Sequence, residues 1–180
     1  RVTVTNPEGN ATHTEYDSKG NVVATWGATY PVVYEYSDYG EMSAMKTYRG
    51  DWEITAQWQL EQLKMDRTKW QYDAATGLLT NKVYADGNGT AYGYYSDGQL
   101  ETRTWARGES TTYYYDSVNQ LTNVVYSDNI TTNISYTYTR LGNTKTVSDA
   151  QGTRTFHYDP STLQPTNEVI VAYDGTTNAI

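Results

Sequence analysis

Turn residues recur about every ten positions along this chain, and no other feature restricts its fold so strongly. They stand at Asn10, Gly20, Pro31, Gly40, Gly50, Gly77, Gly87, Gly98, Gly108, Asn119, Asn129, Gly142, Gly152 and Thr162. Gly and Asn tolerate the positive φ of tight hairpin turns, and Pro favours turns for its fixed φ. Turns this close together allow only antiparallel neighbours, so the spacing predicts a long meander of about fourteen strands.

The segments between the turns have the side-chain pattern of strands. Ile134, Tyr136 and Tyr138 alternate with Ser135 and Thr137, and this period of two is typical of a strand. The chain has 19 Tyr and 5 Trp but one Phe, and aromatic and β-branched residues pack well on a pleated surface. We therefore expect an all-β fold of tandem antiparallel β-hairpins that form a long curved or spiralling strip.

Half of the turns carry a second signature, in which Tyr-Asp precedes a turn residue. The copies are Tyr16-Asp17 with Gly20, Tyr72-Asp73 with Gly77, Tyr115-Asp116 with Asn119, and Tyr158-Asp159; less regular copies are Tyr36 with Gly40, Tyr94 with Gly98, and Tyr138 with Gly142. An Asp before a turn accepts hydrogen bonds from backbone N–H groups further on. The pattern predicts that these residues are structural and define the repeat.

These phased copies resemble the RHS/YD-repeat family, whose signature is Tyr-Asp-x-x-Gly-x-Leu followed by Gly and Tyr-x-Tyr-Asp. The resemblance covers nearly all 180 residues. Segments 104–108 and 149–156 look like those of bacterial members. The resemblance implies one repeat array of about seven repeats over residues 1–180, cut from a larger protein. In full-length relatives such a strip closes into a shell around a polypeptide cargo.

One segment departs from the spacing. Gly50 and Gly77 lie 27 positions apart, so about 17 residues, 51–67, are inserted. Residues 54–65 alternate like a strand but are also rich in helix formers. An extra hairpin and a short helix are both open interpretations, and the first is preferred.

No residue pattern indicates catalysis, so we expect a protein that is not an enzyme and uses no cofactor or metal. Cysteine is absent, and the two histidines, His13 and His157, lie far apart in the sequence. No nucleotide, zinc or hydrolase motif occurs. Toxin-carrying relatives end in a self-cleaving Asp-Pro-x-Gly region, and Asp159-Pro160-Ser161-Thr162 lacks its Gly.

Charge and hydropathy restrict the partners. The net charge is −8 without clustered Lys and Arg, so nucleic acid is not expected as a partner. No apolar run approaches the ~18 residues of a membrane span, so membrane insertion is not expected. The expected partners are other YD repeats of the same or neighbouring chains through edge strands, together with polypeptide cargo or glycans.

The functional expectation is a non-enzymatic structural module of a secreted or cell-surface protein, forming part of an encapsulating shell or a self-assembling fibre. The alternative is an adhesive or carbohydrate-binding module, because aromatic faces stack on sugar rings. A row of exposed Trp would favour this alternative; the five are Trp26, Trp52, Trp58, Trp70 and Trp105. Glycosylation sequons begin at Asn10, Asn88, Asn129 and Asn133.

Overall fold

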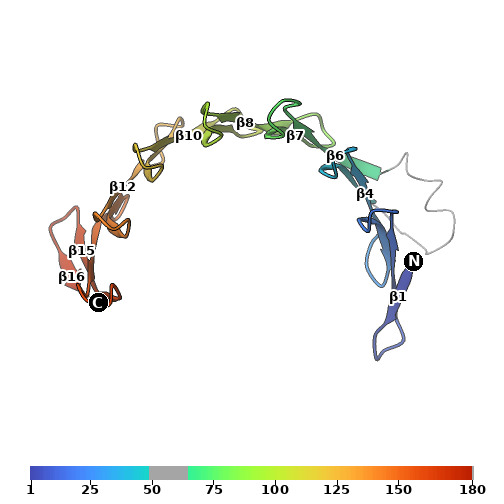
Figure 1. Ribbon diagram of the computed structural model, residues 1–180, viewed down its shortest axis with the longest axis horizontal. Coiled ribbons are helices and arrows are strands. Elements are labelled where there is room, and N and C mark those ends of the chain that lie inside the picture. Colours follow the sequence, from blue (N-terminus) through green and yellow to red (C-terminus); the bar gives the residue numbers. More distant parts are fainter. Residues whose placement is uncertain (49–64, 180) are drawn as a thin grey trace. The chain divides into compact units, whose positions relative to one another are not determined.

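The chain is an antiparallel meander in which every described strand pairs with its neighbours in sequence (Figure 1). The computed structural model describes residues 1–48 and 65–179. The strands are β1 Val2–Thr5, β2 Ala11–Tyr16, β3 Val22–Gly27, β4 Val32–Tyr36, β5 Met42–Tyr48, β6 Met65–Tyr72, β7 Leu79–Val83, β8 Gly89–Tyr94, β9 Leu100–Thr104, β10 Ser110–Tyr115, β11 Leu121–Tyr126, β12 Ile134–Tyr138, β13 Thr144–Asp149, β14 Gly152–Tyr158, β15 Pro165–Ala172 and β16 Thr177–Ala179. No helix occurs within these ranges, and the predicted all-β array of antiparallel hairpins is confirmed.

The strand count differs from the prediction, with 16 described strands where about fourteen were expected. One reason is a turn that the spacing missed at Gly175, whose φ is +84°. Asp174-Gly175 is a turn signal in itself, so the sequence contained the evidence. The first turn uses Gly9, with φ +87°, in place of the predicted Asn10.

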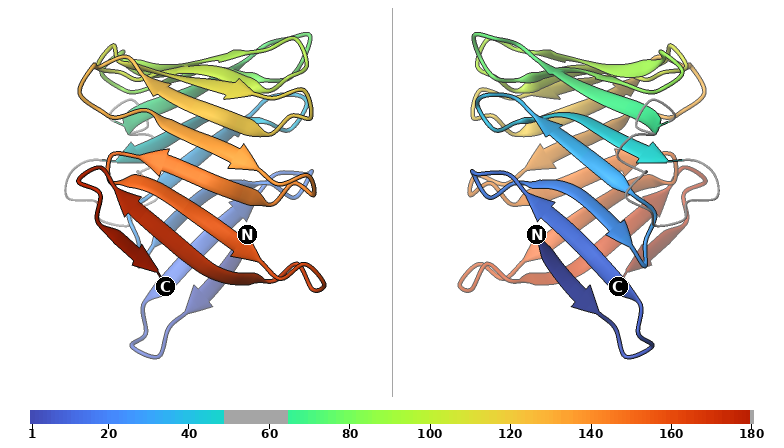
Figure 2. Two further views of the ribbon diagram at one scale, coloured as in Figure 1. Left: turned by 90° about the vertical axis from the view of Figure 1, so that its left-hand side faces the viewer. Right: turned by 90° about the vertical axis from the view of Figure 1, so that its right-hand side faces the viewer.

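The chain forms two compact units, residues 1–90 and 91–180. Within each unit, neighbouring hairpins lie side by side and their turns alternate between two margins of the strip (Figure 2). We call one of these the YD margin; its turns are residues 17–20, 37–40 and 73–77 in the first unit and 95–98, 116–119, 139–142 and 159–163 in the second. The remaining turns lie at the opposite margin.

The described end of the predicted insertion is strand. Met65, Asp66 and Arg67 belong to β6 and pair with β5, with Met65 opposite Tyr48. The last three residues of the predicted insertion, Met65–Arg67, thus extend the strand that leads to the turn after Tyr72. Residues 51–64, including the choice between hairpin and helix, lie outside the described residues.

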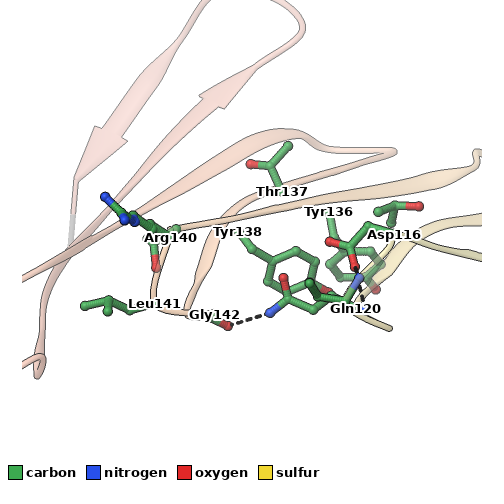
Figure 3. A pocket seen from close by; sticks show the side chains of 11 residues that line it. Asp116, Gln120, Tyr136, Thr137, Tyr138, Arg140, Leu141 and Gly142 are labelled. Carbon is green, nitrogen blue, oxygen red and sulfur yellow. Dashed lines mark hydrogen bonds between the residues drawn. The ribbon is translucent and has the colours of Figure 1, made fainter.

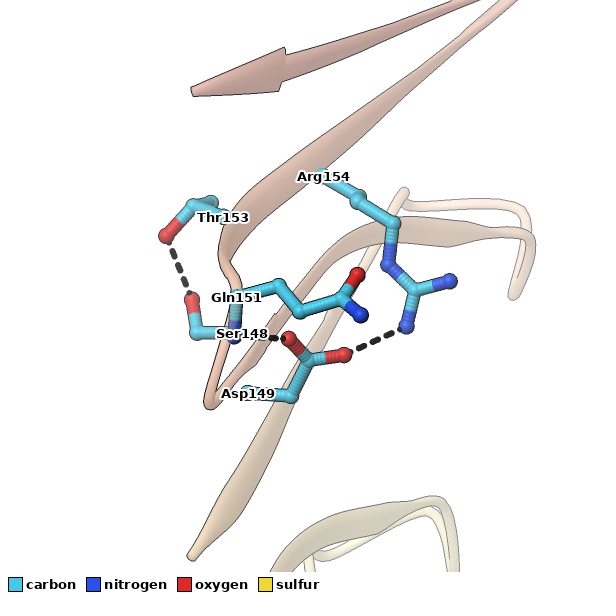
Figure 4. Close-up of polar contacts among 5 residues, drawn as sticks. All are labelled: Ser148, Asp149, Gln151, Thr153 and Arg154. Carbon is cyan, nitrogen blue, oxygen red and sulfur yellow. Dashed lines mark hydrogen bonds and ion pairs between the residues drawn. The ribbon is translucent and has the colours of Figure 1, made fainter. Parts of the chain in front are cut away.

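Only a few side chains of the sheet are buried, so contacts between neighbouring strands contribute much of what holds it together. The buried hydrophobic residues among those described are Ala24, Trp26, Val32, Ala44, Val124 and Val147. Ion pairs contribute on the surface: Glu35 of β4 binds both Lys46 of β5 and Arg67 of β6. In the second unit Arg154 donates to Asp149 at 2.7 Å (Figure 4). Exposed pairs of this kind contribute ~0–1 kcal/mol each.

One turn geometry explains the periodic Gly and Asn. In nine described turns the first residue's N–H donates to the carbonyl four positions on, and the fourth residue's N–H donates back to the first. This pattern is a type I turn followed by a bulge residue with positive φ. Gly fills that position in most turns, Asn119 fills it with φ 67°, and Leu163 fills its counterpart in a turn one residue longer. In the turn predicted near Thr162, the residue with positive φ is thus Leu163.

The substitutions Leu163→Gly and Leu141→Gly are expected to change the free energy of unfolding differently, because of these two leucines only Leu163 has a positive φ, at 59°. Glycine at residue 163 relieves ~1–2 kcal/mol of left-handed strain against ~0.5–1 kcal/mol of added unfolded-state entropy. Glycine at residue 141 brings the entropy cost alone. Chemical denaturation should show the Leu163→Gly chain at least about 1 kcal/mol more stable than the matched Leu141→Gly chain. Equal losses in the two variants would contradict the strain at Leu163.

Candidate functional site: the YD margin

Tyrosine hydroxyls join neighbouring hairpins at the YD margin. The Oη of Tyr138, in β12, donates to the carbonyl of Leu121, in β11, at 2.6 Å. The same bond recurs from Tyr36 to Val22, Tyr72 to Met42, Tyr115 to Leu100 and Tyr158 to Thr144, at 2.7–3.1 Å. In each case the acceptor lies two positions after the positive-φ residue of the preceding turn. We call this contact the tyrosine staple.

A β-bulge directs each of these tyrosines. The register of every YD hairpin shifts at the Tyr that ends its first strand, namely Tyr16, Tyr36, Tyr72, Tyr94, Tyr115, Tyr138 and Tyr158. A bulge re-aims the side chain that follows it. Tyr16 belongs to the first YD hairpin, β2–β3, and is 46% exposed. The seven Tyr singled out in the sequence therefore share one backbone feature.

The Asp after these tyrosines accepts hydrogen bonds from its own turn. The Oδ1 of Asp17 accepts from the N–H groups of Lys19 and Asn21, both at 2.8 Å. Asp73, Asp116 and Asp159 accept from their turns in the same way. In the less regular repeats Ser37 and Thr139 replace the carboxylate with a hydroxyl.

Hydrogen bonds lower the pKa of several turn carboxyls below their usual range. For Asp17 the side chain of Asn21 is the main cause, and for Asp73 the side chain of Thr76 is. For Asp159 the backbone N–H of Thr162 is the main cause. These carboxylates are ionised at neutral pH and occupied by their turns, which leaves them poorly suited to proton transfer.

A wedge-shaped groove lies between β11 and β12, where backbone pairing stops short of the YD margin. Only two residue pairs join these strands, Asn123 with Ser135 and Val124 with Ile134, and the staple closes the far end. The groove has a volume of about 690 Å³, and Asp116 and Gln120 line one side of it (Figure 3). Tyr136, Tyr138, Arg140 and Leu141 line the other side, and Gln120 Nε2 donates to the Gly142 carbonyl across it at 3.2 Å. A second groove lies one repeat earlier and shares Asp116.

Cationic side chains lie over aromatic rings on the strands and next to them. Arg103 lies 3.6 Å from the ring centre of Trp105, and Lys82 lies 5.3 Å from that of Trp70. Trp26 is buried and stacks near His13. The three described tryptophans therefore form no exposed row; Trp52 and Trp58 lie outside the described residues.

The four sequon asparagines, Asn10, Asn88, Asn129 and Asn133, are exposed. Their surroundings differ: Thr90, the hydroxyl residue of the Asn88 sequon, is buried, and Asn133 Oδ1 accepts from the Tyr126 N–H. Asn129 is the sequon whose asparagine and Thr131 are both exposed. Among the described residues no group of three His, Asp or Glu side chains is placed to hold a metal ion, and no helix is long and apolar enough to cross a membrane.

The fold and the YD margin together define a tandem β-hairpin repeat protein. No family model matches the chain, and no curated protein matches it. Similar solved structures include the crystal structure of TcdB2-TccC3-Cdc42, with 16% identity, coverage of 93% of this chain and 11% of that chain, and a TM-score of 0.48. A second is that of TcdB2-TccC3-TEV, with 14% identity, coverage of 93% of this chain and 11% of that chain, and a TM-score of 0.48. A third is that of TcdB2-TccC3, with 12% identity, coverage of 94% of this chain and 12% of that chain, and a TM-score of 0.44. The chain thus spans about one-tenth of the length of these chains.

Removing one staple should destabilise the chain measurably. Tyr138→Phe deletes the hydroxyl that donates to Leu121, which costs about 1 kcal/mol for a half-buried hydrogen bond. Tyr114→Phe is the matched control, because Tyr114 is exposed and its hydroxyl makes no hydrogen bond to the part of the chain that is described. Urea denaturation of the three chains gives the comparison. A Tyr138→Phe chain as stable as the control would show that the staple contributes nothing.

Stability should fall in alkaline solution. Burial raises the pKa of Tyr36, Tyr72, Tyr94, Tyr115 and Tyr138 above 10.0. These tyrosines lose their protons at a lower pH in the unfolded chain than in the folded one. They therefore leave the free energy of unfolding unchanged below pH ~10 and reduce it as the pH rises above that value. Denaturation midpoints measured from pH ~8 to ~11 should show this decline, and it should be smaller for Tyr138→Phe. An equal decline in both chains would assign the effect to other groups.

Proposed function

We propose that this chain is a non-enzymatic structural repeat module of a secreted or cell-surface RHS/YD-repeat protein, forming part of an encapsulating shell or a self-assembling extracellular fibre. The tyrosine staple is the observation that carries the proposal. It joins each hairpin to the one before it at five described junctions. A protein built from such nearest-neighbour contacts extends by adding repeats, which suits a wall or fibre.

The use of the polar side chains supports a structural role. Tyr and Asp are the residues that a catalytic interpretation would require at the YD margin. Their hydroxyls and carboxylates bind the backbone of the same strip instead, as Tyr115 binds Leu100 and Asp116 binds Gln120. At the YD margin these groups are thus engaged in hydrogen bonds to the backbone, whereas an enzyme would need acid and base groups that are not engaged.

The proposed partners are other YD repeats, joined through edge strands, and enclosed polypeptide cargo. Within the described residues β1 and β16 each pair with a single strand, and a strand with one open side recruits another strand. The alternative, an adhesive or carbohydrate-binding module, would draw on exposed aromatic platforms. It has less support, because Trp26 is buried and Trp70 and Trp105 are half-buried.

Light scattering over a concentration series tests assembly through the edge strands. The mass of the wild-type chain should rise with concentration, and Val4→Lys should suppress the rise by placing a charge on the exposed strand β1. Tyr39→Lys is the control, because it adds the same charge at an exposed turn away from the edge strands. A monomer at every concentration would contradict assembly and make a glycan array the next measurement.

A further inference from the structure

Arg103 is a cation of the second unit that the fold stacks on aromatic rings and leaves without an acid. Its Cζ atom lies 3.6 Å from the ring centre of Trp105 and 5.8 Å from that of Tyr92. Among the residues that the structure describes, no carboxylate or carbonyl pairs with its guanidinium, and its buried Nε has no hydrogen-bond partner. Stacking fixes the plane of a guanidinium but satisfies none of its N–H groups. The hydrogen-bonding capacity of Arg103 is therefore not used within the described residues.

Neighbouring strands hold this arginine in place. Arg103 belongs to β9 and lies opposite Tyr92 of β8 and Thr111 of β10. Thr111 in turn lies opposite Tyr126 of β11. Directly opposite residues share one face of a sheet, so these four side chains form a row across four strands. Thr111 is buried, and its Oγ1 accepts a hydrogen bond from Trp105 Nε1 at 3.3 Å. This bond fixes the indole on which the guanidinium stacks.

A second arginine shows which acceptor suits such a group. Arg154 of β14 also has a buried Nε without a hydrogen-bond partner in the described part of the chain, and its Nη2 donates to the Asp149 carboxylate at 2.7 Å (Figure 4). Its acid comes from β13, in the same hairpin. Arg103 has no such acid, because Glu101, two positions before it on β9, forms no ion pair with it. The matching acceptor is a carboxylate, which a guanidinium binds through two parallel N–H···O bonds.

The side chains around Arg103 favour a polypeptide as the source of that carboxylate. Tyr92, Tyr126 and Trp105 are half-buried, so each presents part of its ring at the surface. Binding energy at protein interfaces concentrates in Trp, Tyr and Arg. The guanidinium covers the adjacent face of Trp105, and a sugar ring would need an open aromatic face there. The site therefore has the composition of a protein–protein contact.

We propose that Arg103 binds an acidic side chain of a partner polypeptide, with Trp105 holding the guanidinium in place. The carboxylate accepts two N–H groups, and Tyr92 and Tyr126 contact the residues next to the acid. Salt weakens the contact, because the site is open to solvent on one side. The site does not depend on the proposed shell or fibre role, since β9 pairs on both sides and offers no open edge.

The test is an NMR titration of the full chain, labelled with nitrogen-15, with two short peptides blocked at both ends. One has Glu between two Leu, and the other has Gln in place of the Glu. The Arg103 Nε–H and Trp105 Nε1–H signals should shift saturably with the Glu peptide. The Gln peptide should bind about tenfold more weakly, because it lacks the charge-assisted hydrogen bonds. Equal binding of the two peptides, or binding of neither, would overturn the proposal.

Variants locate the contact on the chain. Arg103→Gln should remove the preference for the Glu peptide. Arg103→Lys keeps the charge but not the planar fork, so it should reduce the preference to about threefold. Arg107→Gln is the matched control, because it removes the same charge from an exposed residue of the next turn. Far-UV circular dichroism checks that each variant keeps its strands. A preference that survives in Arg103→Gln, or that Arg107→Gln loses equally, would contradict a site at Arg103.

Two other occupants of the site would give different results. A galacturonate oligosaccharide that shifts the same two signals at a lower concentration than the Glu peptide would make the ligand an acidic sugar. A second copy of the chain would appear in light scattering as self-association that Arg103→Gln reduces and Arg107→Gln does not. Either result would overturn the proposal of a partner polypeptide. Loss of peptide binding alone leaves assembly through the edge strands intact, so the two proposals fail separately.

Discussion

The hydrogen bond from a tyrosine hydroxyl to the carbonyl of the preceding hairpin is the interaction on which the repeat depends. Backbone pairing between β3 and β4 is limited to Ala24 with Val33 and Thr25 with Val32, so the hairpins would separate towards the YD margin without another contact. Tyr36 supplies that contact at Val22. Each such bond is worth about 1 kcal/mol, which matters in a sheet whose buried residues are few.

The staple also accounts for the surface chemistry of the margin. Its geometry requires a bulge, and the bulge turns the ring of residues such as Tyr138 towards the neighbouring hairpin. Pairing that ends early leaves a wedge between β11 and β12, with the staple at its mouth. The contact that joins two repeats therefore produces the groove between them, and the exposed tips Val118 and Leu141 stand on either side of it.

Several features were predictable from the sequence because they depend on local geometry. The positive φ of the turns explains the periodic Gly and Asn, and a period of two identifies strands such as residues 134–138. Errors arose where two residues satisfy the same local rule: Gly9 adopts the positive φ where Asn10 was expected, and Leu163 adopts it without a Gly. The strand β6 begins at Met65, inside the segment predicted as an insertion. The periodic spacing could not predict this start, because it marks the turns and not the first residue of a strand.

The sequence by itself determined the all-β class, the antiparallel order and the positions of the repeating Tyr and Asp, because each follows from turn chemistry and alternation within a few residues. Only the tertiary structure decided which carbonyl each tyrosine reaches, that Trp26 is buried, and that Val118 and Leu141 flank one groove. These contacts join residues that lie on different hairpins. Their partners depend on register and bulges across strands, which a linear pattern does not encode.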